Sequence, residues 1–198
     1  MRPRVDERGR TGAMPREEAR LIELLRSGDL AALDHLVARY AEGLGAYLGR
    51  IVPDPNRVED IVHDTFIKVF ENPQGLAEVG SLTAWVFRVA RNQALDRVRR
   101  TARRERLRRL WGGNRAPTPE PHEGLLRREA EAAFDRALAE LPEVFRTAFL
   151  LREVEDLSYE QIAAILGCNE KTVSSRLNRA RRRLRERLAP FLDEEDAR

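Results

Sequence analysis

The residues best suited to binding chemistry lie between positions 170 and 185, where short polar side chains and arginines alternate with apolar ones. Small hydroxyl side chains let a helix approach a DNA groove closely, while amide and guanidinium groups reach base edges and phosphates. On a helical wheel, the polar side of this segment predicts contacts with duplex DNA by Lys171, Thr172, Ser174, Ser175, Arg176, Asn178, Arg179 and Arg182.

The elements that must position this face are two helices joined by a tight turn. Residues 157–166 carry apolar positions at helical spacing, Gly167 permits a sharp bend, and Asn169 can cap the next helix. Opposite the polar face runs a narrow apolar stripe of Val173, Leu177, Ala180, Leu184 and Leu188. This order predicts a helix-turn-helix. The alternative is a solvated Arg-rich helix, or one that binds RNA or an acidic protein.

A second candidate surface lies on the long helix that we expect from Ser81 into an Arg-rich segment. One arc of that helix holds Trp85, Arg88, Asn92, Asp96, Arg99, Arg100 and Arg103. An aromatic ring beside Arg and Asn offers stacking and hydrogen bonding, which suits unpaired bases. The preceding loop, from Asn72 to Gly80, could accept a base pulled out of the duplex.

Two alternatives for this long helix stay open. Trp85 can be an ordinary core residue, because the first half of the helix is apolar on most of its sides. Asp96 can pair with a neighbouring arginine in a surface ion network that contributes little stability. If the helix does bind single strands, the predicted contacts are Asn72, Trp85, Arg88, Asn92, Arg99 and Arg100.

An acidic helix is expected over residues 55–71, opened by the capping pair Asp54-Pro55. Its acidic residues, among them Asp60 and Asp64, argue against DNA at this surface and favour a protein partner. The alternative is an ordinary solvated face. His63 has no second histidine four residues away, so we expect no metal site.

The distribution of charge separates these surfaces more sharply than the overall net charge of +3. Residues 81–111 contain ten Arg against two acidic residues, a net charge of +8. Residues 170–188 contain Lys171 and seven Arg against two Glu, a net charge of +6, which leaves −11 for the remainder. Two basic segments in an otherwise acidic chain predict two contacts with a polyanion and a different partner elsewhere.

The pattern of elements predicts an all-α protein with two small helical domains joined by a flexible linker. Strand signals are nearly absent, and Gly and Pro interrupt the helical pattern between Leu110 and Gly124. The expected organisation is a disordered N-terminus (1–14), a first helical domain (15–107), the linker (108–124), a helix-turn-helix domain (125–190) and an acidic tail (191–198).

Composition excludes several other kinds of protein. The single cysteine, Cys168, rules out an internal disulfide and a zinc site built from cysteines of one chain. No apolar run approaches the ~20 residues that span a bilayer, and the Arg-rich N-terminus lacks the apolar core of a secretory signal. We therefore expect a cytoplasmic protein without membrane insertion. We predict no cofactor and no catalytic residue, because no nucleophile–base pair, phosphate-binding loop or metal cluster is evident.

Three segments together resemble bacterial extracytoplasmic-function (group 4) sigma factors of the sigma-70 family. They are residues 58–70 (VEDIVHDTFIKVF), residues 83–100 (TAWVFRVARNQALDRVRR) and residues 141–153 (LPEVFRTAFLLRE) with the helix-turn-helix that follows. The resemblance covers about residues 18–190, in the order in which the family has them. His63 departs from the glutamine that the family commonly has at this position.

The resemblance implies a subunit that binds core RNA polymerase and directs it to particular promoters. The acidic helix would dock on the clamp helices of the largest subunit through Asp60, His63, Asp64 and Phe66. The linker would thread towards the RNA exit path. The long basic helix and the loop before it would read and help open the −10 element. The helix-turn-helix would read duplex DNA at the −35 element through Ser174, Ser175, Asn178 and Arg179. An anti-sigma factor is implied as a regulator.

The leading hypothesis is therefore a non-catalytic promoter-specificity subunit. The alternative is an autonomous helix-turn-helix transcription regulator whose first domain senses a ligand or dimerises. Specific duplex binding by the protein alone, with a palindromic footprint, would favour that alternative. A third hypothesis, an enzyme, would require an activity that is lost when Asp60 or Asp64 is replaced.

Overall fold

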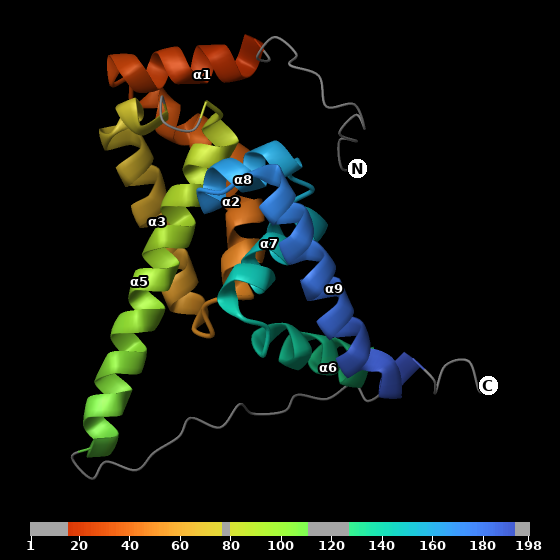
Figure 1. Ribbon diagram of the computed structural model, residues 1–198. Helices are drawn as coiled ribbons and strands as arrows, with labels where there is room; N and C mark the ends of the chain where they lie inside the picture. The colour runs from red at the N-terminus through yellow and green to blue at the C-terminus, as the bar shows by residue number, and fades with distance from the viewer. Residues whose placement is uncertain (1–15, 77–79, 111–126, 193–198) are drawn as a thin grey trace.

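The computed structural model describes residues 16–76, 80–110 and 127–192, and within these ranges it contains helices and no strand. The expected N-terminal segment, most of the linker and the end of the acidic tail lie outside the described residues. No described helix is both long and apolar enough to cross a membrane. Figure 1 shows the helices, which are α1 (Arg16–Ser27), α2 (Ala31–Gly49), α3 (Pro55–Glu71), the 3₁₀ turn η1 (Pro73–Gly75), α5 (Leu82–Leu110), α6 (Arg127–Ala139), α7 (Glu143–Glu153), α8 (Tyr159–Leu166) and α9 (Glu170–Leu192).

Capping side chains that the sequence predicted fix the starts of two helices in the first domain. Asp54 caps α3 by accepting the N–H of Asn56 (3.1 Å), and Ser81 caps α5 in the same way (3.3 Å). Glu18 of α1 adds a cap from a distant part of the chain, because its carboxylate accepts the N–H of Leu82 (3.2 Å). The first helix is thereby tied to the start of the long basic helix.

Three boundaries differ from the expectation. α5 continues to Leu110, three residues into the expected linker, because arginine and leucine are strong helix formers and the first breaker is Gly112. A proline at the start of a helix is expected in its first turn, but Pro142 is the N-cap residue of α7 (φ −50°, ψ 139°). α9 runs to Leu192, beyond the expected domain end at residue 190.

The first domain is a bundle of α1, α2, α3 and α5 around inaccessible aliphatic side chains. Its centre consists of Leu36, Leu44, Leu48, Ile61, Val69 and Leu82. A short chain of hydrogen bonds crosses the bundle, since Gln93 of α5 donates to the Thr65 hydroxyl (3.0 Å), which donates to the carbonyl of Ile61 (2.6 Å). Buried polar groups need such partners, so this chain fixes the rotation of α5 against α3.

The second domain packs α6, α7, α8 and α9 around Leu138, Leu150, Leu151, Ile162 and Leu177. The two domains also touch, with α8 lying against α5 (Figure 1). Their buried apolar side chains form one continuous cluster. Residues that are far apart in the sequence therefore become neighbours, as when Arg91 of α5 binds Glu143 of α7 (2.6 Å).

Gly167 ends α8 in the left-handed conformation (φ 62°, ψ 42°), which costs an L-residue about 1–2 kcal/mol. A Cβ at this position would meet no atom within 4 Å. An alanine here would therefore be destabilising because of its backbone conformation and not because of a steric clash. We expect Gly167→Ala to lower the free energy of unfolding in urea by about 1–2 kcal/mol.

The matched control is Gly49→Ala at the end of α2. Gly49 is helical and its added Cβ would also meet open space, so this variant should be neutral or slightly stabilising. Equal unfolding free energies for the two variants would contradict the role assigned to the turn.

Candidate nucleic-acid interface

The turn before α9 is held by paired caps. At α8, Ser158 and Gln161 form a capping box in which each side chain accepts the other's backbone N–H (3.1 and 3.0 Å). Gly167 then reverses the chain, and Asn169 Oδ1 caps α9 by accepting the N–H of Thr172 (2.8 Å). The predicted order of helix, turn and helix is confirmed.

One side of α9 is buried against the rest of its domain. Val173, Leu177 and Ala180 are inaccessible, Leu184 is nearly so, and Leu188 continues the stripe as a half-buried residue. These positions pack towards α7 and α8. Because an apolar stripe fixes the rotation of a helix about its axis, the opposite side of α9 faces solvent.

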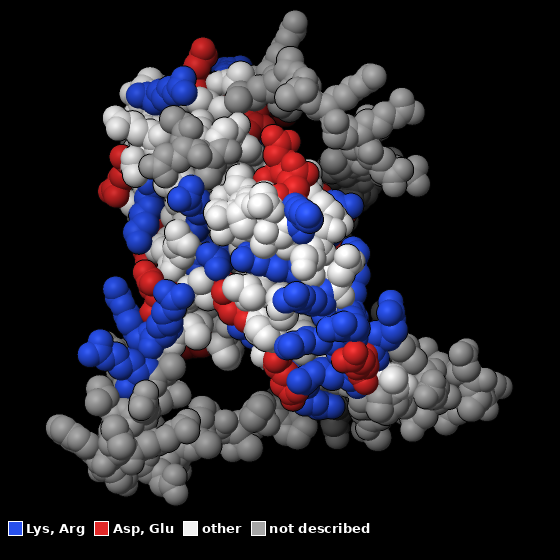
Figure 2. Space-filling model, in the orientation of Figure 1, with Lys and Arg blue, Asp and Glu red and all other residues white. Residues whose placement is uncertain are grey.

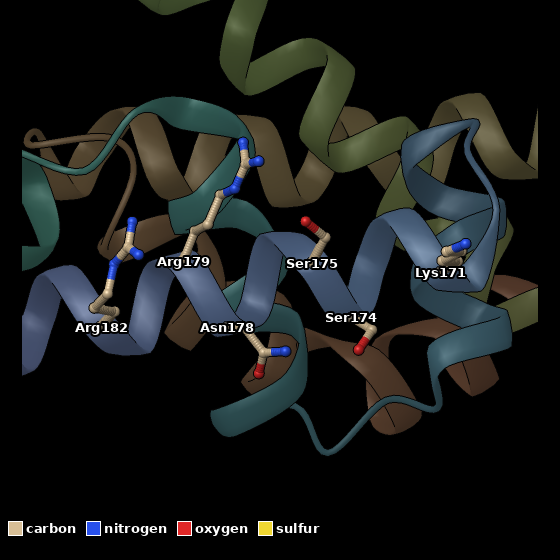
Figure 3. Close-up of a pocket in the computed structure, with 6 residues that line it drawn as sticks. All are labelled: Lys171, Ser174, Ser175, Asn178, Arg179 and Arg182. Atoms are coloured by element: carbon tan, nitrogen blue, oxygen red, sulfur yellow. The ribbon is translucent and has the colours of Figure 1, made fainter.

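This outward side forms a shallow depression lined by six of the predicted residues. They are Lys171, Ser174, Ser175, Asn178, Arg179 and Arg182. Figure 3 shows them spaced along α9, with Lys171 at one end and Arg182 at the other. Ser174 is half-buried and the other five are exposed. Lys and Arg also gather over this part of the surface (Figure 2), so the depression suits an anionic ligand.

Two predicted DNA contacts are turned towards their own domain. The Thr172 hydroxyl donates to Asn169 Oδ1 (2.8 Å) and so completes the cap of α9. Arg176 is half-buried, and its Nη1 lies 3.7 Å from Cys168 Sγ. Both side chains stabilise the turn in this structure, and a DNA contact by either one stays a prediction.

Other arginines of α9 hold the helix in place instead of lining the depression. Arg181 donates to Glu153 of α7 (2.7 Å), and this hydrogen bond raises the pKa of Arg181. Arg183 lies over the ring of Phe145, 5.3 Å from its centre, in a cation–π contact. In the sequence these arginines follow one another without distinction. In the structure some of them line the depression, and others contact side chains of α7.

The second predicted surface follows α5. Asn92, Arg99 and Arg100 are exposed, while Arg88 is half-buried. Asn72 is exposed where it caps the C-terminus of α3, a helix that packs on α5. Residues 77–79, at the centre of the loop predicted to accept a base, lie outside the described residues.

Trp85 packs within the first domain. It is half-buried, and its indole ring lies so close to Gly75 of η1 that any Cβ there would collide with it. The indole N–H is buried and has no hydrogen-bond partner among the described residues. Trp85 therefore packs at the edge of the core and joins η1 to α5, while a contact of Trp85 with DNA stays a prediction.

The acidic face of α3 is partly neutralised by the neighbouring helix. Arg97 of α5 donates to Asp64 (2.5 Å) and lies 3.5 Å from Asp60. Asp60 and His63 are exposed, whereas Asp64 is half-buried. Two predicted partner contacts therefore already share an arginine of their own chain.

Beside these carboxylates an apolar groove runs between α2 and α3. It is lined by Val37, Ala41, Gly45, Val58, Glu59, Val62, His63 and Phe66. Phe66, which the sequence predicted as a partner contact, is only 4% exposed, because α2 covers it. Val37 is 47% exposed and is the apolar side chain of the groove that solvent reaches most easily.

The α2 side of this groove was missed by sequence reasoning. Val37, Ala41 and Gly45 lie four residues apart, which is a second stripe on α2 beside the core stripe through Leu36 and Tyr40. That spacing was the available signal. It did not identify the groove, because a single helix does not reveal which of two adjacent stripes its neighbours cover.

Two family models match the chain in this order. The sigma-70 region 2 model matches residues 36–104, and the sigma-70 region 4 model matches residues 131–184. The RNA polymerase sigma-H factor of Pseudomonas aeruginosa is 32% identical over 90% of this chain and 97% of the relative. The ECF RNA polymerase sigma-E factor of Escherichia coli is 32% identical over 87% of this chain and 94% of the relative.

Solved structures agree with this assignment. CnrH, in complex with the cytosolic domain of CnrY, has a TM-score of 0.63 and 26% identity, covering 89% of this chain and 97% of that one. The sigma factor RpoE of Bartonella quintana, in complex with the anti-sigma factor NepR, has a TM-score of 0.55 and 28% identity, covering 88% and 95%.

The helix-turn-helix with its basic depression, the basic helix α5 and the apolar groove beside an acidic face agree with these matches, and the class of protein is a transcription initiation factor. The chain belongs to the sigma-70 family of RNA polymerase sigma factors, in its extracytoplasmic-function group. It is a promoter-directing sigma factor, and an autonomous regulator is not favoured.

The division of arginines on α9 can be tested by salt dependence. Arg182→Ala removes a cation from one end of the depression, so the slope of log K against log salt should fall in magnitude by about 1 for a labelled DNA duplex. Arg181→Ala removes the same charge from a side chain that pairs with Glu153, and should leave the slope unchanged. Fluorescence anisotropy of the free protein at several salt concentrations measures both, and equal slopes would contradict the division.

Proposed function

We propose that this chain binds core RNA polymerase and gives it promoter specificity, in the cytoplasm and without catalysing a reaction itself. The α9 depression reads duplex DNA at the −35 element. The exposed side of α5, with the loop that follows Asn72, reads and opens the −10 element. The observation that carries the proposal is the presence, on one chain, of two basic faces and an apolar groove beside an acidic face.

The shape of α9 supports a role in the major groove, which is about 12 Å wide and admits one helix. Ser175, Asn178 and Arg179 lie towards the middle of the depression, where amide and guanidinium groups can pair with purine edges. Lys171 and Arg182 lie at its ends and suit the phosphates that flank the groove. The residues in the middle of the depression would then select the DNA sequence, and the residues at its ends would set the register of α9 on the DNA.

At the −10 element the proposal depends on the exposed polar side of α5. Asn92, Arg99 and Arg100 offer an amide and two guanidinium groups, which suit the bases and backbone of a separated strand. Trp85 packs on Gly75, so its role here is to hold the start of the base-accepting loop. Stacking by Trp85 itself would require that contact to open.

The groove between α2 and α3 suits a polymerase helix that carries apolar side chains between basic ones, and we assign it to the clamp helices of the largest subunit. Val37 and Val62 supply apolar surface, and the nearby Asp60 and Asp64 supply negative charge. Because Arg97 already neutralises part of that charge, a basic partner has to compete with it. We therefore expect the affinity of this groove for core polymerase to come from shape complementarity and apolar contact more than from net charge.

The proposal includes a path for the linker and a regulatory partner. The linker expected at residues 108–124 would thread towards the RNA exit path once the two domains are engaged. An anti-sigma factor would hold the chain inactive, which is supported by the similarity to a sigma factor solved with the anti-sigma factor NepR.

The deciding experiment is run-off transcription with purified core polymerase on genomic promoter fragments. We expect specific transcripts only when the chain is added, and weak duplex binding by the chain alone. Tight, specific binding by the free protein with a palindromic footprint, together with failure to form a complex with core polymerase, would instead establish the autonomous regulator.

The role of the groove as the docking site can be tested by placing a glutamate inside it and, as a control, outside it. Val37→Glu places a charge at the groove, and we expect it to weaken the complex with core polymerase about tenfold or more. Leu30→Glu is the control, since Leu30 is 70% exposed and does not line the groove. Equal affinities of the two variants, measured by titration of labelled protein with core polymerase, would mean that the groove is not the docking site.

A further inference from the structure

Arg97 lies where the acidic face of α3 meets the basic side of α5. Its Nη2 lies 2.5 Å from Asp64 Oδ2, and its Nη1 lies 3.5 Å from Asp60 Oδ2. Both carboxylates belong to the face that we assign to core polymerase, whereas α5 is the helix that we assign to the −10 element. In the chain by itself, an arginine of the DNA-binding helix therefore occupies two groups of the docking face.

The position of Arg97 on α5 places it at the border between two sides of that helix. Gln93, one turn earlier, donates to the hydroxyl of Thr65 on α3 (3.0 Å), so this edge of α5 faces α3. Arg100, three residues later, is exposed on the side assigned to DNA. Residues three or four apart on a helix are neighbours on its surface. The long side chain of Arg97 can therefore reach either side through a change of rotamer.

The two helices are held together without Arg97. Besides their apolar contact, Gln93 joins α5 to Thr65 of α3, and Arg57 of α3 donates to the hydroxyl of Thr101 on α5 (3.0 Å). These bonds lie before and after Arg97 along α5. The pairing of Arg97 with the carboxylates of α3 is thus an additional link, and its loss leaves the contact between the helices in place.

The ion pairs of Arg97 are open to solvent. The side chain of Arg97 is 32% exposed, and those of Asp64 and Asp60 are 43% and 67% exposed. Ion pairs with this much access to water contribute little to stability, because water and salt screen them. A cation on a docking partner can therefore take the place of Arg97.

Docking changes the charge that surrounds Arg97. Once cations of core polymerase bind Asp60 and Asp64, Arg97 loses its attraction to them and faces like charges. A promoter strand on the exposed side of α5 brings phosphates, to which a guanidinium forms directed hydrogen bonds. The favourable position for Arg97 then lies on the DNA side of α5, beside Arg100.

We propose that Arg97 is a further promoter-binding residue that docking makes available. It is bonded to Asp60 and Asp64 in the free chain, and it moves to a phosphate of the −10 strand when core polymerase takes those carboxylates. The inference rests on the proposed function. Because coupling between two binding events is reciprocal, the −10 strand strengthens docking by the same factor by which docking strengthens binding of the strand.

Salt dependence shows in which state Arg97 contacts DNA. The probe is a labelled single strand with the −10 element of a promoter identified by run-off transcription, and its binding is measured by fluorescence anisotropy at several salt concentrations. In the complex with core polymerase, Arg97→Gln should reduce the slope of log K against log salt by about 0.7, the value for one phosphate contact on a single strand. In the chain alone the slope should not change, because the carboxylates hold Arg97.

Three further variants serve as controls. Arg100→Gln removes an exposed guanidinium, so it should reduce the slope both in the chain alone and in the complex. Arg57→Gln removes another bond between α3 and α5 without touching Asp60 or Asp64, so it should change neither slope. Arg97→Lys keeps the positive charge and should retain the slope of the complex, which a variant that misfolds would not.

Neutral carboxylates test the transfer without polymerase. Asp60→Asn together with Asp64→Asn removes both partners of Arg97, so the slope for the chain alone should rise by about 0.7. A phosphate contact reads no sequence, so a labelled oligothymidylate serves as the probe here. Adding Arg97→Gln to this variant should abolish the rise.

Arg97→Gln alone should also tighten binding to core polymerase by about two- to fivefold, since it removes a partly exposed competitor for the carboxylates. Equal losses of slope in the chain alone and in the complex would mean that Arg97 contacts DNA without docking, and would overturn the transfer. Unchanged slopes in both states would reduce Arg97 to a link between α3 and α5, and would overturn it as well.

Failure of the proposed function gives a different result. In that case the unaltered protein forms no complex with core polymerase, whatever residue stands at position 97. The series at Asp60, Asp64 and Arg97 in the chain alone would still decide whether the carboxylates withhold Arg97 from DNA.

Discussion

The burial of one apolar stripe on each basic helix is the constraint on which the binding surfaces depend. Val173 and Leu177 have no accessible surface on α9, and the first half of α5 is buried in its bundle. Burying one such side chain contributes about 1.5–3 kcal/mol, so a rotation that exposed the stripe would cost several such amounts. The outward direction of the six side chains that line the depression on α9 follows from that rotation. DNA recognition in this protein is therefore set by its apolar core.

Arginine has two separate roles on this framework. Arg179 lines a surface that faces solvent, whereas Arg181, two residues on, pairs with an acid of α7. The arginines of α5 differ in the same way. Arg99 and Arg100 are exposed to solvent, whereas Arg97 neutralises two carboxylates of α3. The planar guanidinium suits both roles, because it forms directed bonds to carboxylates as well as to phosphates and bases. The local net charge alone does not show which role an arginine has.

The contact between the domains combines two properties that seldom occur together in a stable core. It buries a whole tyrosine and joins two apolar clusters, yet it leaves polar atoms of Tyr47, Arg91 and Arg146 without partners. Apolar burial favours closure, and the unsatisfied groups limit how strongly it does so.

The sequence by itself determined the all-α fold, the helix-turn-helix and the family. Caps such as Asp54 and Asn169, the breaker Gly167 and the spacing of apolar positions act over a few residues, so they can be identified without the rest of the chain. Six of the eight residues predicted on α9 line one depression for the same reason. Only the tertiary structure decided that Trp85 packs on η1, that α2 covers Phe66, and that the domains meet. These outcomes depend on which distant helix covers each face, and local periodicity carries no information about that.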